Sequence, residues 1–257
     1  MRLDNFLVLN KNIESRNKAN ILIKEGNVLV NNKKILKPSF DVDDSDEIEI
    51  IKELSYVSRG GLKLEGAIKV FNLDFRDKVI LDIGSSTGGF TDCALKHGAK
   101  LVYAVDVGKN QLHPTLKNDK RVISYEETNI RDITSFSLKL DYVVMDVSFV
   151  SIEYLLPSIS RFMNEAYASI ILIKPQFEVG KMHLKNGIVK DKNLYKKILE
   201  NIINELSKYD LGIMDLKLSP IKGGSGNTEF LSLIKKGESR VNILSFLGEI
   251  NDKKDNS

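Results

Sequence analysis

Apolar runs that stop at a charged residue recur in the second half of this chain. Tyr142–Met145 is followed by Asp146, and Ala168–Ile173 is followed by Lys174. Nearly continuous apolar runs are typical of parallel strands that are covered on both faces. In an open parallel α/β sheet, ligands bind just beyond the carboxyl ends of the strands. The pattern therefore predicts an active site at the edge of a sheet, with Asp146 and Lys174 close together.

From Lys78 onward, strand-like and helix-like segments alternate, which is typical of a doubly wound α/β fold. A long helix is predicted around Leu194–Tyr209, and the glycine-rich segment Ser219–Asn227 leads into an antiparallel closing strand. The predicted strands are Val79–Ile83, Leu101–Val105, Tyr142–Met145, Ile170–Ile173, Met214–Leu218 and Thr228–Ile234. We therefore expect a Rossmann-like sheet with an antiparallel last strand.

The first fifty residues show a different pattern, that of a small α+β module. Apolar residues have helical spacing from Leu3 to Ile13, and Ser15 is placed to cap a second helix that ends at Gly26. Short strands are predicted at Val28–Val30 and Glu47–Ile50. The resulting division of the chain is 1–50 for the module, 51–57 for a junction, 58–240 for the α/β domain and 241–257 for a partly disordered, polar tail.

Composition narrows the class of protein without indicating a reaction. The chain has 257 residues and a formal net charge of +3, which permits nucleic-acid binding without demanding it. Basic residues gather before Phe40 and acidic residues follow it, and a solvated helix face is the simplest interpretation. The single cysteine, Cys93, excludes an internal disulfide. No signal peptide or bilayer-spanning stretch is visible, so we expect a cytoplasmic protein that binds no membrane.

A glycine loop, Asp82–Phe90, joins a predicted strand to a predicted helix. Its spacing, Gly84-x-x-x-Gly88-Gly89, differs from the G-x-G-x-x-G of dinucleotide-binding loops. Asp106 ends the next strand, where an acid would accept hydrogen bonds from ribose hydroxyls. S-adenosylmethionine, which has a ribose but no pyrophosphate, fits this pattern better than NAD. The alternative is a tight strand–helix turn with no ligand.

Two further charged residues strengthen the case for an active site. Lys63 lies on a predicted helix after two glycines, and Glu229 is flanked by apolar residues of the closing strand. An acid inside an apolar strand normally needs a partner. Two lysines and two acids at one edge would form a paired network. Taken alone, Glu229 would more simply be a surface acid on an edge strand.

The first module resembles the S4 RNA-binding domain along nearly its whole length. The matching segments are Arg2-Leu3-Asp4, Ser15-Arg16, Ala19, Ile23-Lys24-Glu25-Gly26, Val28–Asn31, Lys37-Pro38 and Asp46-Glu47-Ile48. The resemblance implies that Arg2, Arg16, Lys18 and Lys24 face RNA phosphates, in a mode of contact that weakens with salt.

The rest of the chain resembles the TlyA family of ribosomal RNA 2′-O-methyltransferases, long labelled hemolysins, whose catalytic domain is of the FtsJ/RrmJ type. The matching segments are Tyr56–Ala67, Leu81–Cys93, Val102–Gly108, Asp146–Phe149, Ile173–Glu178, Ser219–Gly223 and Gly226–Leu231. The resemblance implies a class I methyltransferase sheet and maps the family's Lys-Asp-Lys-Glu tetrad onto Lys63, Asp146, Lys174 and Glu229. The residues expected to bind the cofactor are Asp82, Gly84, Ser85, Gly88, Gly89, Phe90, Asp106 and Asn129, with Arg59 as a further RNA contact.

This resemblance also implies a substrate, a cytidine ribose in 23S rRNA and in some members also in 16S rRNA. The chain begins directly at Arg2-Leu3-Asp4, like the shorter family form that modifies only the large subunit. A membrane-active hemolysin and a non-catalytic ribosome-assembly factor are the alternatives. The expected partners are ribosomal RNA and the ribosomal subunit, bound by a monomer.

The chemistry of such a reaction is consistent with these residue types. A ribose 2′-hydroxyl is a poor nucleophile that needs alignment and a group to take its proton. Lys174 is the candidate base, since a lysine near another cation and away from bulk water loses its proton more readily. Cys93 lies in a predicted packed helix, and the three histidines lack metal-ligand spacing, so we expect no metal. Gln176–Lys192, which contains four lysines, is either a mobile RNA-gripping loop or a solvated surface loop.

Overall fold

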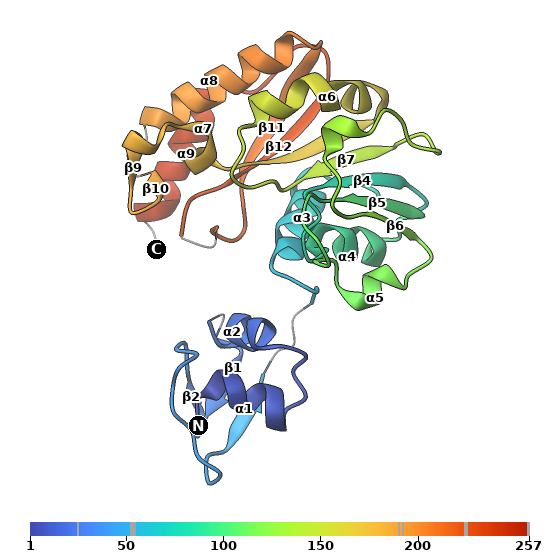
Figure 1. Cartoon of the computed structure of the whole chain (residues 1–257). Coiled ribbons are helices and arrows are strands. Elements are labelled where there is room, and N and C mark those ends of the chain that lie inside the picture. Colours follow the sequence, from blue (N-terminus) through green and yellow to red (C-terminus); the bar gives the residue numbers. More distant parts are fainter. Residues whose placement is uncertain (25, 52–54, 190, 192, 224–225, 256–257) are drawn as a thin grey trace. The chain divides into compact units, whose positions relative to one another are not determined.

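A computed structural model describes the whole chain except residues 25, 52–54, 190, 192, 224–225 and 256–257 (Figure 1). The chain divides into two compact units, Met1–Arg59 and Gly60–Ser257. Each unit has its own hydrophobic core and is described by itself.

The first unit has two helices and a small antiparallel sheet with strand order β2-β1-β3. Its elements are α1 (Leu3–Asn10), α2 (Arg16–Lys24), β1 (Val28–Val30), β2 (Lys33–Lys34) and β3 (Ile48–Ile50). Ser15 caps α2, because its Oγ accepts a hydrogen bond from the Lys18 amide at 3.2 Å. Asn31 and Asn32 both have positive φ and form the tight turn between β1 and β2. The expected α+β module is therefore present.

The second unit contains a seven-stranded sheet with the order β11-β12-β8-β7-β4-β5-β6. The last strand, β12, is inserted between β8 and β11 and runs antiparallel to both of them. The strands are β4 (Val79–Ile83), β5 (Leu101–Val105), β6 (Val122–Tyr125), β7 (Tyr142–Met145), β8 (Ala168–Ile173), β11 (Leu211–Leu218) and β12 (Phe230–Lys236). The sequence-based fold class is confirmed, and β6 is an additional edge strand.

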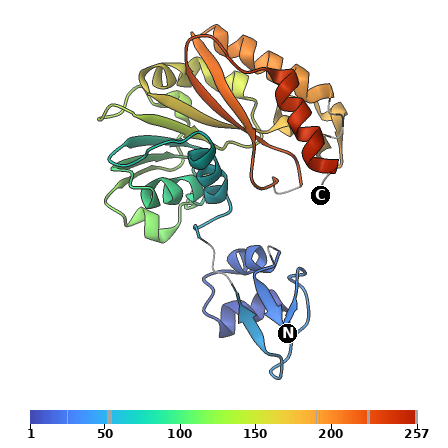
Figure 2. The same ribbon diagram turned by 180° about the vertical axis from the view of Figure 1, so that it is seen from behind.

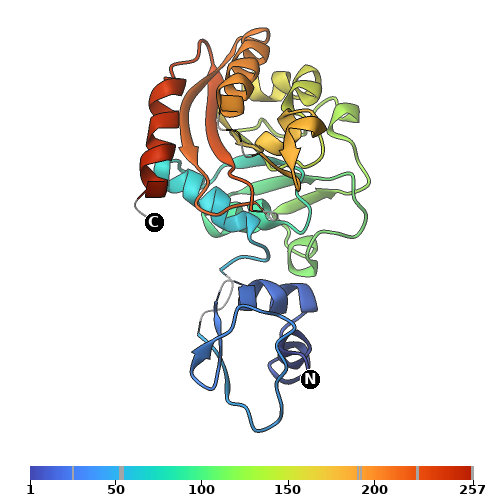
Figure 3. The ribbon, with the colours of Figure 1, turned by 90° about the vertical axis from the view of Figure 1, so that its left-hand side faces the viewer.

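Helices cover both faces of this sheet (Figures 2 and 3). On one face α4 contacts β4 and β5 and packs against α3, and on the other α6 and α8 contact β11. Residues of β4 alternate between the faces, so that Leu81 joins the core shared with α6 while Asp82 points to α4. The helices are α3 (Gly60–Val70), α4 (Gly89–Lys96), α5 (Pro114–Lys117), α6 (Ile152–Glu165), α7 (Pro175–Glu178) and α8 (Asn193–Ser207).

Two segments differ from their sequence-based descriptions. Residues 243–255, expected as part of a partly disordered tail, form helix α9 (Ile243–Asp255), whose Phe246 and Ile250 join the core. The basic segment after Lys174 contains α7 and a hairpin of β9 (Leu184–Lys185) and β10 (Ile188–Val189). Lys190 and Lys192, two of its four lysines, lie outside the described residues. Across the described residues, no helix combines the length and apolarity needed to cross a membrane.

Candidate active site

Three of the four tetrad residues reach one edge of the sheet because of strand direction. Asp146 directly follows β7 and Lys174 directly follows β8. Glu229 directly precedes β12, and since β12 is antiparallel, its start lies at the edge where β8 ends. Phe230 accordingly pairs with Ile173. Lys63, on the first turn of α3, completes the group.

Ion pairs join the four side chains into one chain of alternating charges. Glu229 Oε2 lies 2.8 Å from Lys63 Nζ, which lies 3.4 Å from Asp146 Oδ2. Asp146 Oδ1 lies 2.6 Å from Lys174 Nζ. The four side chains are 3 to 16% exposed, so they interact with little screening by water. The structure therefore brings together the residues that the sequence suggested as a paired network.

Two residues that complete this network were matched only as parts of family segments, with no role of their own predicted from the sequence. Ser148 Oγ accepts a hydrogen bond from Lys174 Nζ at 2.8 Å. Gly223 lies against the Glu229 carboxylate so closely that a Cβ atom at position 223 would overlap Oε1. A serine in a loop and a glycine among other glycines look ordinary in a sequence. Only the fold shows what they contact.

A cleft of about 650 Å³ opens beside the network, within the size range of small-molecule sites. It lies at the ends of β4, β5 and β7, where the strand order of the sheet reverses. Of the expected cofactor residues, Gly84, Asp106 and Asn129 line it, together with Asp146 and Ser148. Asp106 accepts hydrogen bonds from the amides of Ser86, at 2.8 Å, and Gly108, at 2.7 Å.

The other expected cofactor residues are buried behind the cleft. They are Asp82, Ser85, Gly88, Gly89 and Phe90. Gly88 has φ +93°, and a Cβ atom there would overlap Leu116 and Leu112, so packing of the loop already requires glycine. Their direct contact with a cofactor remains a prediction, whereas their support of the loop is visible in the structure.

Asp82 is fully buried, and its Oδ2 accepts a hydrogen bond from the Thr91 hydroxyl of α4 at 2.6 Å. Burial raises the pKa of Asp82 to about 7, against the opposing effect of Thr91 and with added repulsion from Asp146 and Asp106. A carboxyl whose folded-state pKa is raised contributes its full stability below its unfolded pKa. That contribution is lost as the pH rises through about 7.

We therefore expect Asp82→Asn to become progressively more stable than the wild type as the pH rises from 5 to 8. The amide keeps an acceptor for Thr91 but never carries a charge. The difference should grow by at most about 3 kcal/mol over this range, because the folded-state pKa of about 7 lies about two pH units above its start. Melting curves at each pH measure this difference. Asp92→Asn, on the helix α4 that also carries Thr91, is the control. A difference that does not change with pH would contradict the raised pKa.

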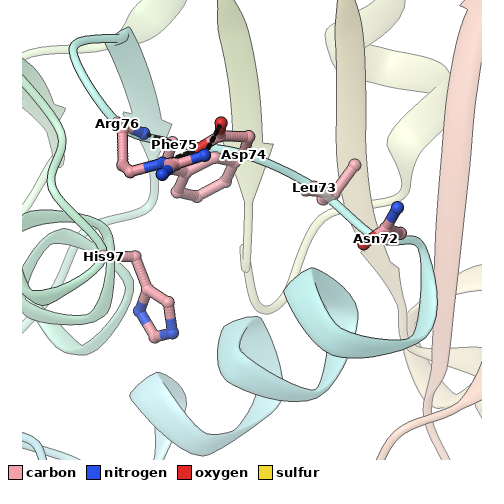
Figure 4. Close-up of a pocket in the computed structure, with 6 residues that line it drawn as sticks. All are labelled: Asn72, Leu73, Asp74, Phe75, Arg76 and His97. Carbon is pink, nitrogen blue, oxygen red and sulfur yellow. Dashed lines mark hydrogen bonds and ion pairs between the residues drawn. The ribbon is translucent and has the colours of Figure 1, made fainter.

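A second hollow, of about 460 Å³, is lined by residues of the segment between α3 and β4 and by the end of α4 (Figure 4). Asp74 and Arg76 form an exposed ion pair at 2.7 Å on its wall, and His97 lies across from them. None of the tetrad residues lines it among the described residues. The hollow is therefore separate from the network.

In the first unit, the arginines predicted to contact RNA share one buried acid. Arg2 donates two hydrogen bonds to Asp4, at 3.0 and 2.8 Å, and Arg16 donates one at 3.1 Å. These donors hold the pKa of the Asp4 carboxyl well below its usual range. Both arginine side chains remain about half exposed. Lys18 pairs with Glu14, Lys24 is exposed and Arg59 is partly buried.

The fold and site together define the class of the protein. A seven-stranded sheet with an antiparallel strand inserted next to the last edge, and a cleft at its carboxyl ends, is a methyltransferase architecture. The sequence profile of the FtsJ-like methyltransferase family matches residues 56–236, and that of the S4 domain matches residues 1–48. The chain belongs to the TlyA family of FtsJ-like methyltransferases that carry an S4 domain.

Curated relatives are similar over almost their whole length. "Hemolysin A" of Brachyspira hyodysenteriae is 44% identical over 90% of this chain and 98% of its own. "23S rRNA (cytidine-2'-O)-methyltransferase TlyA" of Campylobacter jejuni is 37% identical over 90% of this chain and 97% of its own. "16S/23S rRNA (cytidine-2'-O)-methyltransferase TlyA" of Mycobacterium tuberculosis is 35% identical over 93% of this chain and 91% of its own.

Solved structures agree with this family. A protein named as a hemolysin from Streptococcus thermophilus is 36% identical, with a TM-score of 0.78 over 100% of this chain and 97% of its own. A second such protein, from Lactococcus lactis, is 43% identical, with a TM-score of 0.72 over 77% of this chain and 100% of its own.

Proposed function

We propose that this enzyme transfers a methyl group from S-adenosylmethionine to the 2′-hydroxyl of a cytidine in 23S ribosomal RNA. The observation that carries the proposal is the network of Lys63, Asp146, Lys174 and Glu229 beside a cleft at the carboxyl edge of the sheet. The relatives from C. jejuni and M. tuberculosis, whose names state this reaction on 23S and on 16S/23S rRNA, support the substrate. A ribosomal substrate would place the enzyme in the cytoplasm.

The residues that line the cleft fit S-adenosylmethionine. Each carboxylate oxygen of Asp106 accepts one backbone hydrogen bond, which leaves acceptor capacity for the hydroxyls of a ribose. Asp146 brings a negative charge to the same cleft, a suitable neighbour for a cationic sulfonium. The cofactor supplies an electrophilic methyl group.

The chain's own residues would align the ribose hydroxyl and handle its proton. Lys174 Nζ is held at 2.6 Å from Asp146 and 2.8 Å from Ser148, in a largely buried place where its orientation is defined. An unprotonated Lys174 amine would accept the hydroxyl proton. Lys63 adds positive charge near the developing alkoxide, and Glu229 balances Lys63.

The first unit would deliver the RNA. Arg2 and Arg16 are both held by Asp4 with their side chains half exposed, so they can contact phosphates while keeping their buried partner. We expect Arg2→Ala/Arg16→Ala to reduce methylation of ribosomal substrate at least tenfold at moderate salt and to leave cofactor affinity unchanged. Filter binding measures the affinity for ribosomal RNA, a methylation assay measures the rate, and calorimetry measures the affinity for the cofactor. An unaltered methylation rate would contradict the assignment.

Subunits from a strain that lacks such an enzyme test the proposed function directly. The purified protein, S-adenosylmethionine with a labelled methyl group, and 50S or 30S subunits are incubated separately, and the labelled nucleotide is mapped by mass spectrometry. Label on the ribose of a cytidine in 23S rRNA is the expected result. Label on a base, or on neither subunit, would refute the proposal, and label on both subunits would extend it to 16S rRNA.

Asp106→Ala should weaken S-adenosylmethionine binding about tenfold or more. The substitution removes the acceptor for the ribose and also the hydrogen bonds that hold Ser86 and Gly108 at the cleft. Calorimetric titration measures the affinity, and Asp119→Ala, which removes an exposed ion pair with Arg121, is the matched control. Tighter binding of NAD than of S-adenosylmethionine by the wild type would sink the cofactor assignment.

A further inference from the structure

The Lys174 amine is held from two sides, and only one of its two partners belongs to the charged network. Its Nζ atom lies 2.6 Å from Asp146 Oδ1 and 2.8 Å from Ser148 Oγ. A protonated lysine amine has three N–H groups. Across the described residues, Asp146 is its ion-pair partner and Ser148 accepts its hydrogen bond, so the amine has further N–H positions for a substrate.

The two groups that contact the Lys174 amine both reach the cleft. Asp146 and Ser148 both line the cleft, so both groups that hold Lys174 stand at the boundary between the buried amine and the ligand space. The loop turns sharply here, because Phe149 has φ +67°. The Phe149 ring stands 5.1 Å from that of Phe177, which follows Lys174 on α7, so the two loops meet at this point.

We infer that Ser148 is a positioning residue, whose hydroxyl fixes the rotation of the Lys174 amine so that a free position faces the substrate hydroxyl. The ion pair with Asp146 does not fix this rotation, because it aligns no N–H with Oδ1. The hydrogen bond to Ser148 fixes one N–H, and the tetrahedral geometry of the amine then places the other two positions. When the amine is neutral, its lone pair then takes the place from which the proton is accepted. This inference rests on the proposed function and adds a residue to it.

Removing the Ser148 hydroxyl has two separable consequences. The amine loses the hydrogen bond that holds it, and it loses its orientation toward the substrate. The first predicts faster chemical labelling of Lys174, while the second predicts slower methyl transfer. Loss of packing alone would not produce this combination.

The experiment compares Ser148→Ala with Ser148→Thr, which keeps the hydroxyl at an exposed position with room for a methyl group. Ser151→Ala is the matched control. Ser151 lies in the same loop and its hydroxyl donates to Glu178 at 2.6 Å, remote from the Lys174 amine. Acetic anhydride acetylates accessible lysine amines, and peptide mass spectrometry gives the rate of Lys174 acetylation at one pH. Single-turnover methylation is measured at the same pH.

We expect Lys174 acetylation to be about fivefold faster in Ser148→Ala and to stay near the wild-type rate in the other two variants, since a hydrogen bond contributes about 1 kcal/mol. Single-turnover methylation should fall about tenfold in Ser148→Ala and recover in Ser148→Thr. Unchanged labelling would show that the contact is absent in solution, and an unchanged methylation rate would show that it does not orient the amine. Either result overturns the inference. A wild type that methylates no ribosomal RNA refutes the proposed function instead, and labelling still decides the contact.

Discussion

Replacing Lys174 by methionine should reduce methyl transfer by about 10²- to 10⁴-fold, the usual contribution of a positioned acid–base group, while the protein stays folded. Methionine keeps an unbranched apolar side chain in a place that is 9% exposed. Asp146 also keeps a partner, because Lys63 Nζ lies 3.4 Å away. Single-turnover methylation measures the loss and a melting curve checks the fold.

Lys174→Arg should fail almost as completely, because a guanidinium stays protonated and cannot accept the hydroxyl proton. Near wild-type activity of this variant would show that Lys174 acts only as a positive charge. Asp146→Ala is a poor test of whether the charged network serves catalysis. It would leave two largely buried lysines without their shared carboxylate and so cost several kcal/mol of stability.

Replacing Lys63 by methionine should have the largest effect on stability. Its partner Glu229 is 3% exposed, and a buried carboxylate without its cation costs about 3–5 kcal/mol. For a domain of this size, that corresponds to a fall in melting temperature of about 10 °C. Methylation should be lost as well, since Lys63 also contacts Asp146.

The double variant Lys63→Met/Glu229→Gln separates stability from activity. Glutamine removes the unpaired charge, so most of the lost melting temperature should return while methylation stays absent. Glu229→Gln alone should cost less than Lys63→Met, because Lys63 still has Asp146. If the Lys63→Met variant has the melting temperature of the wild type, Glu229 is solvated and its ion pair with Lys63 does not stabilise the fold.

The sequence predicted the parts of the site that depend on strand ends. Asp146 and Lys174 are recognisable because each interrupts an apolar run, and parallel strands end at one edge. Glu229 gives a weaker local signal, an acid inside an apolar strand, which a surface position would also explain. It joins the site because β12 is antiparallel and starts where β8 ends, and its tetrad role was implied by resemblance to a family.

The missed features depend on contacts between distant residues. Ser148 looks like any loop serine until Lys174, 26 residues away, is placed beside it. Helix α9 was missed although Ile243, Phe246, Leu247 and Ile250 have helical spacing, because the polar residues that follow them suggested a disordered tail. Asp82 was predicted as a ligand contact, and its burial against Thr91 could not be read from the loop sequence.

The insertion of β12 between β8 and β11 also determines when the enzyme becomes active during its own synthesis. Until residues 230–236 have been made, β8 has an open edge and Lys63 has no Glu229 to neutralise it. A pairing between such distant parts of the chain forms late, because the entropy of closing a long loop opposes it. A nascent chain therefore already carries the S4 domain and the glycine loop while it still lacks a complete catalytic network. By the proposed function, an enzyme built in this order would contact ribosomal RNA before it is able to modify it.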